Sequence, residues 1–351
     1  MSSNSFGNKI TITTFGESHG IAIGVILDGI EPGFTIDPEL IQNELDRRKP
    51  GQSSITTPRK ESDTVHILSG LFENKTLGSP IAMIINNSDH HSADYSAIKD
   101  VYRPGHADLT YQLKYGLRDH RGGGRSSGRE TAARVAAGAI AKQLLNQIGI
   151  TITAYTKELA GISCDTIDLE EIEKNSLRAP DPLAAQKMLN QVQKIIDSGD
   201  SCGGIIECIC DNIPAGLGDP MFDKLDANLA HAIVSIGAVK GIEFGKGFEV
   251  AALLGSENND SFDGKKFTNH AGGILGGISS GEQIVFRCPV KPTPSISQQQ
   301  QAMNALGELE TIEIKGRHDP CICPRIIPVI ESMTALTILD AYYSQFGKIL
   351  K

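Results

Sequence analysis

The feature that most constrains the fold is a run of small residues at 131–148, TAARVAAGAIAKQLLNQI. Alanine has the highest intrinsic helix propensity, so this run predicts a strong helix. Ser127 and Glu130 stand before it at the spacing of a capping box, and Gly149 follows its end. Because the side chains are short, we expect the Ala-rich face of this helix to pack closely against other elements.

Strand and helix patterns are intermixed along the rest of the chain. Apolar or alternating runs predict strands at 9–15, 21–27, 65–71, 81–85, 151–155, 204–210, 248–254 and 283–290. Helical patterns, two of them opened by an Asp-Pro pair, cover 37–47, 181–198, 222–236 and 327–346. Loops are predicted at 48–61 and 295–301, and 86–125 has few apolar runs. This order, without repeats or a clean linker, favours an α+β or layered α/β fold in one compact domain, residues 1–351.

Charge and composition exclude several classes of protein. Lys and Arg number 33 against 42 Asp and Glu, and the resulting net charge of −9 is unlike that of a dedicated nucleic-acid binder. No apolar run approaches the roughly 18 residues of a membrane-spanning helix. The first residues show no charged-then-apolar signal region. We therefore expect a cytoplasmic protein that binds neither nucleic acid nor membrane, with its seven cysteines as reduced thiols.

Six of the 13 arginines lie between residues 103 and 134. Four of them surround a glycine run in HRGGGRSSGRETAAR, where Gly122 to Gly124 let the backbone approach a ligand. Ser126 and Ser127 add hydroxyl groups at a helix start, whose unpaired N–H groups and dipole favour an anion. Arginine recognises phosphate and carboxylate in a bidentate manner. The segment therefore predicts an anion site rather than a plain basic surface.

This anion site matches neither of two common nucleotide-binding patterns. Ser127 stands where the dinucleotide pattern needs its last glycine, and Arg129-Glu130 stands where a P-loop has Lys and Ser or Thr. An RNA-binding patch at 118–134 is an alternative. Against it stand the negative net charge, the scarcity of aromatic residues and the predicted helix start. The residues themselves favour an enzyme with an Arg-rich pocket for a small polyanion.

Two histidines are candidate catalytic residues, because each lies in a break bounded by glycine. His19 lies in FGESHG and His106 in RPGHAD, where either imidazole could act as a general acid or bind an anion. Taken alone, each histidine could equally be structural. The segment GRHDPCICPR at 316–325 holds one His and two Cys, but their spacing is not a usual zinc pattern, so no metal is expected. Alternation along 204–210 places Cys208 and Cys210 on one face of a strand, as buried thiols.

Six segments resemble the signature segments of the chorismate synthase family. In chain order between residues 15 and 321 they are FGESHG, DRRKPG, RPGHAD, KYGLRDHRGGGRSSGRETAARVAAGA, NHAGGILGGISSG and KGRHDPC. The resemblance implies a lyase that converts 5-enolpyruvylshikimate 3-phosphate to chorismate and phosphate by 1,4-anti elimination, the last step of the shikimate pathway. It implies a requirement for reduced FMN, although the reaction has no net redox change. It also implies a β-α-β sandwich, with central helices between antiparallel sheets, and a homotetramer.

The resemblance also implies roles for individual residues. His19, His106 and Asp319 match the family's catalytic positions: His19 assists departure of phosphate, and the other two act near the flavin. The matches to substrate-binding positions are Ser18, Arg48, Arg103, Ser127, Arg129 and Arg317. The matches to FMN-binding positions are Arg125, Ser126, Ser127, Gly237, Ala238, Gly276, Lys291, Pro292, Thr293, Pro294, Ser295 and Arg317.

The sequence departs from the family pattern at three positions. Ser54 stands where many members have Arg, Gly237 where many have Asn, and Pro294 where Ser is common. Ser54 removes one possible phosphate contact, for which Arg59 could compensate. With no reductase domain and no dinucleotide motif, we expect FMN to be reduced by an outside partner rather than by this chain with NADPH. We also expect the loops 48–61 and 86–125 to tighten when ligands bind.

Overall fold

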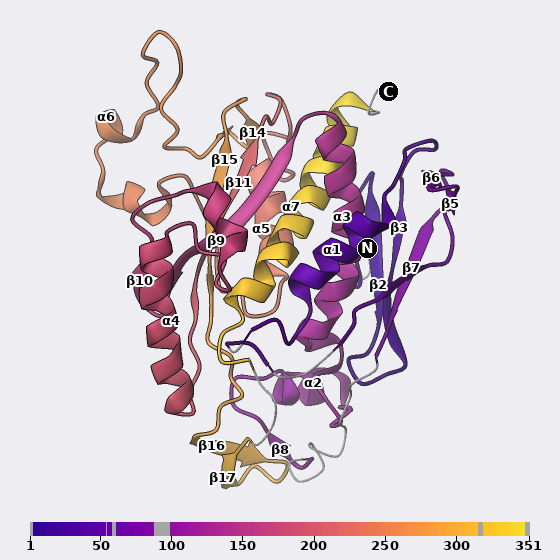
Figure 1. The fold of residues 1–351 in the computed structure, drawn as a ribbon, viewed down its shortest axis with the longest axis vertical. Helices are drawn as coiled ribbons and strands as arrows, with labels where there is room; N and C mark the ends of the chain where they lie inside the picture. Colours follow the sequence, from indigo (N-terminus) through magenta and orange to yellow (C-terminus); the bar gives the residue numbers. More distant parts are fainter. Residues whose placement is uncertain (1–2, 54, 58–60, 88–98, 315–318, 348–351) are drawn as a thin grey trace.

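In the computed structural model, helices lie between two five-stranded antiparallel sheets (Figure 1). The structure describes residues 3–53, 55–57, 61–87, 99–314 and 319–347. Two long helices, α3 (Thr131–Gln147) and α7 (Cys323–Phe346), form the centre, with α1 (Pro38–Arg48) and α5 (Leu225–Val234) packed against them. The β-α-β sandwich with central helices, expected from the resemblance, is confirmed.

Close packing of α3 follows from its small side chains. Gly138 faces Ser332 of α7 so closely that a Cβ atom on Gly138 would lie 2.2 Å from the Cβ of Ser332. Twelve residues of α3, from Thr131 to Leu145, are buried. The helix therefore contacts α1 and α7 on one side and the strands of the first sheet on the other, as its composition predicts.

The first sheet has the strand order β1-β2-β3-β7-β4. Its strands are β1 (Ser5–Phe6), β2 (Thr11–Gly16), β3 (Ala22–Asp28), β7 (Ile81–Asn86) and β4 (Val65–Ile67). Val25 of β3 pairs with Thr14 on one side and with Met83 on the other. Ile23, Val25 and Leu27 are fully buried whereas Ile26 is exposed, so one face of the sheet covers the helices.

The second sheet has the strand order β10-β9-β11-β15-β12. Its strands are β10 (Ile162–Ser163), β9 (Thr151–Leu159), β11 (Gly204–Asp211), β15 (Ile284–Val290) and β12 (Glu243–Phe244). Cys208 and Cys210 of β11 are both fully buried, which confirms their prediction as core thiols. α4 (Pro182–Asp197) lies outside this sheet, beside β10, with Asp181 as its N-cap.

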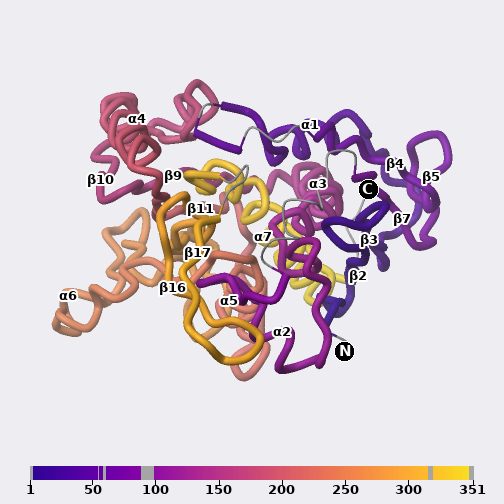
Figure 2. Tube along the Cα trace, turned by 90° about the horizontal axis from the view of Figure 1, so that it is seen from below, coloured from indigo at the N-terminus to yellow at the C-terminus, as the bar shows by residue number. Residues whose placement is uncertain are grey.

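Smaller elements gather at one end of the sandwich, where α3 and α7 begin (Figures 1 and 2). They are α2 (Asp108–Tyr115), β8 (Val101–Tyr102), β16 (Gln299–Asn304) and β17 (Leu309–Glu313), with the 3₁₀ turns η2 (Gly124–Ser126) and η3 (Gly128–Glu130). The other short elements are β5 (Leu71–Phe72), β6 (Lys75–Thr76), β13 (Ile274–Leu275), β14 (Ile278–Ser279), α6 (Gly255–Asn258), η4 (Leu169–Lys174) and η5 (Gly247–Ala252).

The structure corrects several sequence predictions. Segment 248–254, predicted as a strand, forms mainly the 3₁₀ turn η5, which contacts the edge strand β12 of the second sheet without joining that sheet. α2 and β8 lie within 86–125, and β16 begins inside the predicted loop 295–301. Ser127 Oγ does accept from Arg129 N, but it caps the turn η3 rather than α3 itself. The Glu130 carboxylate accepts instead from Arg134 and Thr14, at 2.9 and 2.8 Å.

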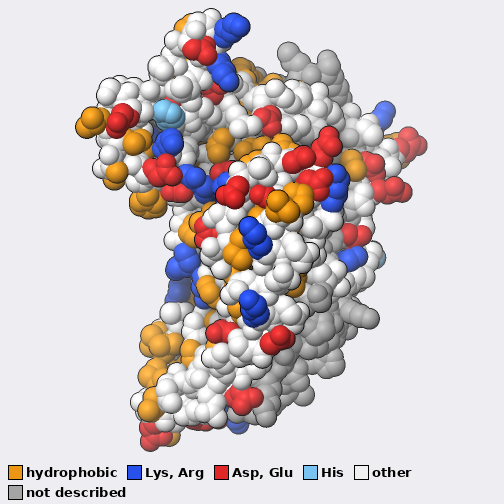
Figure 3. All heavy atoms as spheres, turned by 60° about the vertical axis from the view of Figure 1, so that its left-hand side comes forward, with side chains coloured by type: hydrophobic (Ala, Val, Ile, Leu, Met, Phe, Trp, Pro, Cys, Tyr) orange, Lys and Arg blue, Asp and Glu red, His pale blue; other side chains and the backbone are white. Residues whose placement is uncertain are grey.

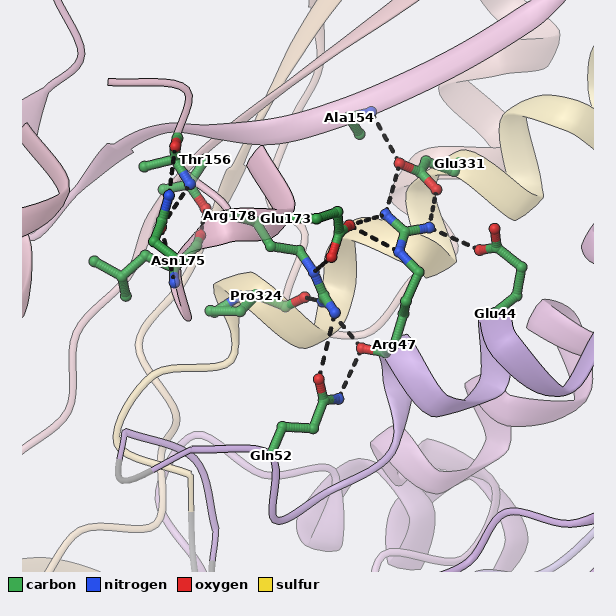
Figure 4. Close-up of polar contacts among 12 residues, drawn as sticks. Glu44, Arg47, Gln52, Ala154, Thr156, Glu173, Asn175, Arg178, Pro324 and Glu331 are labelled. Carbon is green, nitrogen blue, oxygen red and sulfur yellow. Dashed lines mark hydrogen bonds and ion pairs between the residues drawn. The ribbon is translucent and has the colours of Figure 1, made fainter. Parts of the chain in front are cut away.

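Helix α7 begins four residues before the predicted start and contains Pro328. Proline has no N–H, so the carbonyl of Pro324 loses its partner in the helix. Arg178 Nη1 donates to that carbonyl instead (Figure 4). By length and composition α7 could cross a membrane, but 83% of its most apolar 18-residue stretch is buried inside the protein, as in a core helix.

Candidate active site

A cavity of about 390 Å³ opens at the end of the sandwich where α3 and α7 begin. Segments from six parts of the chain form its wall. Most of the predicted site residues lie in that wall: Arg48, Arg103, His106, Ser126, Ser127, Arg129, Gly237, Ala238, Lys291, Thr293, Pro294, Ser295 and Asp319. The tertiary structure thus brings together residues that are up to about 270 positions apart in the sequence.

Arg48 and Arg129 form one side of the cavity. Arg48 ends α1, and Arg129 lies in the turn η3 before α3. Both guanidinium groups pair with the buried carboxylate of Asp63, the first at 2.7 Å. Burial and the nearby charges of Arg325 and Arg129 lower the pKa of Arg48 to about 10, against the opposing effect of Asp63. Arg48 thus stays protonated at neutral pH.

Arg103 approaches the cavity from the segment before α2. Its Nε and Nη2 atoms donate to the two carboxylate oxygens of Asp108, at 2.7 and 2.8 Å. Arg118 pairs with the same carboxylate at 2.9 Å. Burial alone would raise the pKa of Asp108, but hydrogen bonds and charge from Arg103 lower it below the ordinary range. The orientation of Arg103 is therefore fixed before any ligand binds.

His106 is held at the cavity wall by the segment that follows β15. Its Nε2 atom lies 2.8 Å from Ser295 Oγ. Lys291 Nζ donates to the carbonyl of Gly105 at 2.9 Å. Gly105 has a φ of +71°, and a Cβ atom there would lie 2.8 Å from the Cβ of Pro294. Glycine is required before His106 because the backbone there has a positive φ and because Pro294 lies too close to leave room for a side chain.

Asp319 joins the cavity from the segment before α7. Its carboxylate accepts from the Thr57 N–H at 3.0 Å and pairs with Arg325. Arg325 also donates from Nε to the Arg48 carbonyl at 3.2 Å. Sequence reasoning assigned no role to Arg325, although it stands only six residues after Asp319. The predicted start of the last helix at 327 placed Arg325 outside that helix, whereas α7 carries it to the cavity.

Other predicted residues lie away from the described cavity wall. Ser18 Oγ lies 3.0 Å from His19 Nδ1, and the imidazole packs against Gly122, behind the glycine run. Arg125 turns towards β2 and donates to Thr14 and to the Gly16 carbonyl. Gly276 lies in the turn between β13 and β14, and Pro292 is exposed beside the wall.

Arg317, Ser54 and Arg59 lie outside the described residues. The same is true of His318 and of parts of the loops 48–61 and 86–125. Within the described part of the chain, no group of three His, Cys, Asp or Glu side chains could hold a metal ion.

The arginines of segment 118–134 do not form an open basic surface. Each is paired with a carboxylate within 4 Å: Arg118 with Asp108, Arg121 with Asp119, Arg125 and Arg134 with Glu130, and Arg129 with Asp63. An RNA-binding patch presents unpaired basic groups to the phosphate backbone. This pairing therefore argues against the RNA-binding alternative.

The cavity wall also has features that suit a flat cofactor with a polar edge. Ile236, Ile322, Ile326 and Val329 provide apolar surface. Thr293 Oγ1 is buried and has no hydrogen-bond partner among the described residues. A buried hydroxyl without a partner is unfavourable unless a ligand satisfies it. A Cβ atom on Gly237 would meet open space, so the backbone there is accessible from the cavity.

The layered fold and this cavity define an α+β enzyme that binds a small anionic molecule among buried arginines. The family profile of chorismate synthase matches residues 10–343. The chain is 55% identical over 350 residues to a chorismate synthase of Lachnospira eligens, covering 98% of this chain and 96% of the relative. A chorismate synthase of Methanosarcina mazei is also 55% identical, with coverage of 97% and 96%. The protein belongs to the chorismate synthase family.

A solved structure leads to the same conclusion. A crystal structure of chorismate synthase superposes with a TM-score of 0.76 at 31% sequence identity, covering 96% of this chain and 93% of the other. The similarity therefore extends over nearly the whole chain.

Proposed function

We propose that this protein converts 5-enolpyruvylshikimate 3-phosphate to chorismate and phosphate, the last step of the shikimate pathway. The observation that carries the proposal is the convergence of Arg48, Arg103, Arg129 and Arg325 on one cavity. The substrate carries two carboxylates and one phosphate, and planar guanidinium groups bind both kinds of anion in a bidentate manner. Groups that are already oriented also stabilise the phosphate as it departs.

Reduced FMN is the cofactor that we propose for this cavity. It would supply electron density for loss of the phosphate, without net oxidation. Thr293, whose buried hydroxyl has no partner in the described part of the chain, and the backbone of Gly237 and Ala238 would hold it. The apolar side chains of Ile322, Ile326 and Val329 would exclude water from its ring. The further FMN-binding assignments are Arg125, Ser126, Ser127, Gly276, Lys291, Pro292, Pro294, Ser295 and Arg317.

The catalytic groups are assigned by their match to the family's catalytic positions, and two of them, His106 and Asp319, line the cavity. His106, hydrogen-bonded to Ser295, would hold a proton beside the cofactor ring. Asp319, which pairs with Arg325, would assist removal of the substrate proton. His19 would assist departure of phosphate next to the glycine run. Ser18, Arg48, Arg103, Ser127, Arg129 and Arg317 would hold the substrate.

We propose that the protein works in the cytoplasm as a homotetramer and receives reduced FMN from an outside reductant. Exposed apolar side chains on the segment that carries η5 and α6 support an interface between copies (Figure 3). Phe248 and Leu254 there are 85% and 67% exposed. Large apolar side chains that are exposed close together are typical of a surface that binds another protein chain.

The test is phosphate release from 5-enolpyruvylshikimate 3-phosphate under anaerobic conditions, with FMN either chemically reduced or left oxidised. Release with reduced FMN alone is the expected result. Release with both forms would contradict the cofactor assignment. No release in either case, with FMN bound, would indicate a different substrate, and Ser54 and Gly237 would then be the first positions to exchange.

A further inference from the structure

Asp63 lies behind the arginines of the cavity rather than in its wall. Its side chain is 0% exposed, and it is absent from the residues that line the cavity, whereas Arg48 and Arg129 line it. The carboxylate uses both oxygens: Oδ2 accepts from Arg48 Nη1 at 2.7 Å, and Oδ1 accepts from Arg129 Nη1. One buried carboxylate therefore holds two guanidinium groups that belong to α1 and to the turn before α3.

Further contacts fix the planes of both guanidinium groups. Arg48 Nη2 donates to the Gly128 carbonyl at 2.9 Å. Arg129 donates from Nε to Asn87 Oδ1 at 2.8 Å and from Nη2 to the Asn86 carbonyl at 3.0 Å. These carbonyl and amide groups are neutral, so Asp63 supplies the charge that is shared between the two arginines. A second carboxylate, that of Glu61, lies farther away, with Oε2 4.0 Å from Arg129 Nη2. Without the Asp63 carboxylate, the orientation of each guanidinium group would be less well fixed. Less negative charge would then offset the repulsion between Arg48 and Arg129.

The charges around Asp63 make that repulsion large. Arg129 and Arg325 both lie close enough to Arg48 for their positive charges to lower its pKa. Burial would raise the pKa of Asp63, but Arg48 and Arg129 lower it, so the group is a carboxylate at neutral pH. Like charges that lie close together in a partly desolvated site repel each other strongly.

The backbone at Asp63 is also unusual. Its φ is +48°, in the left-handed region that residues other than glycine seldom adopt. Aspartate is among the residues that tolerate this conformation better than most, because its side chain is short and polar. The turn directs the carboxylate inwards, to the two arginines, immediately before β4 begins at Val65.

We infer that Asp63 is a positioning residue for substrate binding, which sets the separation and planes of Arg48 and Arg129 from behind the cavity. The inference rests on the proposed function, because it assigns both arginines to the anionic substrate. Asp63 does not line the cavity, whereas Arg48 and Arg129 do. Placed behind the arginines, it orients them while their remaining N–H groups face the ligand.

The experiment compares Asp63→Asn and Asp63→Glu with the unchanged protein. Asparagine keeps the size and removes the charge, whereas glutamate keeps the charge and shifts it by one methylene group. The matched control is Asp46→Asn, also an aspartate paired with a basic residue, Lys49, but with a side chain on α1 that is 43% exposed. Binding of 5-enolpyruvylshikimate 3-phosphate is measured directly by calorimetry, KM and kcat by phosphate release with reduced FMN, and folding by urea denaturation.

We expect Asp63→Asn to weaken substrate binding and to raise KM by about tenfold or more, with a much smaller change in kcat. Asp63→Glu should recover part of the affinity, and Asp46→Asn should bind as the unchanged protein does. An equal or tighter affinity in Asp63→Asn would overturn the inference, and a tighter affinity would show in addition that Asp63 competes with the substrate for the arginines. Loss of folding in both Asp63 variants would also overturn it, since the residue would then be structural.

Failure of the proposed function is a separate result. If the unchanged protein does not bind 5-enolpyruvylshikimate 3-phosphate in the calorimeter, the assigned substrate is wrong. If it binds this substrate and the Asp63→Asn variant binds it equally well, the substrate stands and only the role of Asp63 is refuted.

Discussion

Replacing Glu331 by glutamine should destabilise the protein by about 3 kcal/mol, because this carboxylate joins four elements in the core. Glu331 of α7 is 2% exposed. It accepts from Arg47 Nη1 of α1 at 2.6 Å and from the Ala154 N–H of β9 at 3.0 Å (Figure 4). It also accepts from Lys142 Nζ of α3 at 2.8 Å. Loss of one partner from a buried ion pair leaves the other charge without full compensation.

The magnitude follows from two estimates that agree. Burial would raise the pKa of Glu331, but Lys142 and Arg47 outweigh it and lower the pKa from 4.5 to about 2. A difference of this size between the folded and unfolded states corresponds to about 3 kcal/mol. Removing one partner of a buried pair generally costs about 3–5 kcal/mol. The lower figure applies because Glu44 still pairs with Arg47 and Lys142, at 2.8 and 2.7 Å.

Urea denaturation as a function of pH tests this reasoning. A carboxylate whose pKa is lowered by folding stabilises the protein fully above its unfolded pKa, and loses that effect as the pH falls towards the folded value. The difference between the two proteins should therefore be constant from pH 7 to about 5, and shrink below about 4.5. Glu249→Gln, which removes an exposed pair with Lys246, should change stability by less than about 0.5 kcal/mol. A difference below about 1 kcal/mol at pH 7, or one that persists unchanged at acid pH, would refute the charge argument.

Three further changes follow from close contacts and assigned roles. Gly138→Ala should destabilise the protein by about 1–3 kcal/mol in urea denaturation, because its Cβ would lie 2.2 Å from that of Ser332. Gly122→Ala should lower turnover with little change in the denaturation midpoint, because its Cβ would lie 2.0 Å from Nδ1 of His19 and displace the ring. His106→Ala should lower turnover by about 100-fold or more with a modest loss of substrate affinity, measured by phosphate release and calorimetry.

Gly255→Ala is the control for the glycine variants, because its Cβ would meet open space. It should leave stability and turnover unchanged. A Gly138→Ala variant as stable as this control would show that α3 and α7 can separate without loss. Full turnover in Gly122→Ala would remove His19 from the phosphate-leaving role, and full turnover in His106→Ala would remove that histidine from the catalytic groups.

Much of the fold could be predicted because its signals are local. The Ala-rich run at 131–148 predicts a closely packed helix, which α3 is. Asp-Pro pairs mark the starts of α1 and α4. The prediction of a strand at 248–254 was wrong, because an apolar run by itself does not distinguish a strand from an exposed 3₁₀ turn. Pairing with a neighbouring strand decides which of the two forms.

The order of the strands in each sheet, and the partners of the charged residues, were decided by the tertiary structure. The sequence determined that this chain has helices and strands intermixed, that Arg129 lies at a helix start and that anions are favoured there. Nothing local relates Arg48 to Asp63 and Gly128, or Arg47 to Glu331, which stands 284 positions later. Such pairs form because burial makes each charge require a counter-charge, and the packing of α1, α3 and α7 determines which one is within reach.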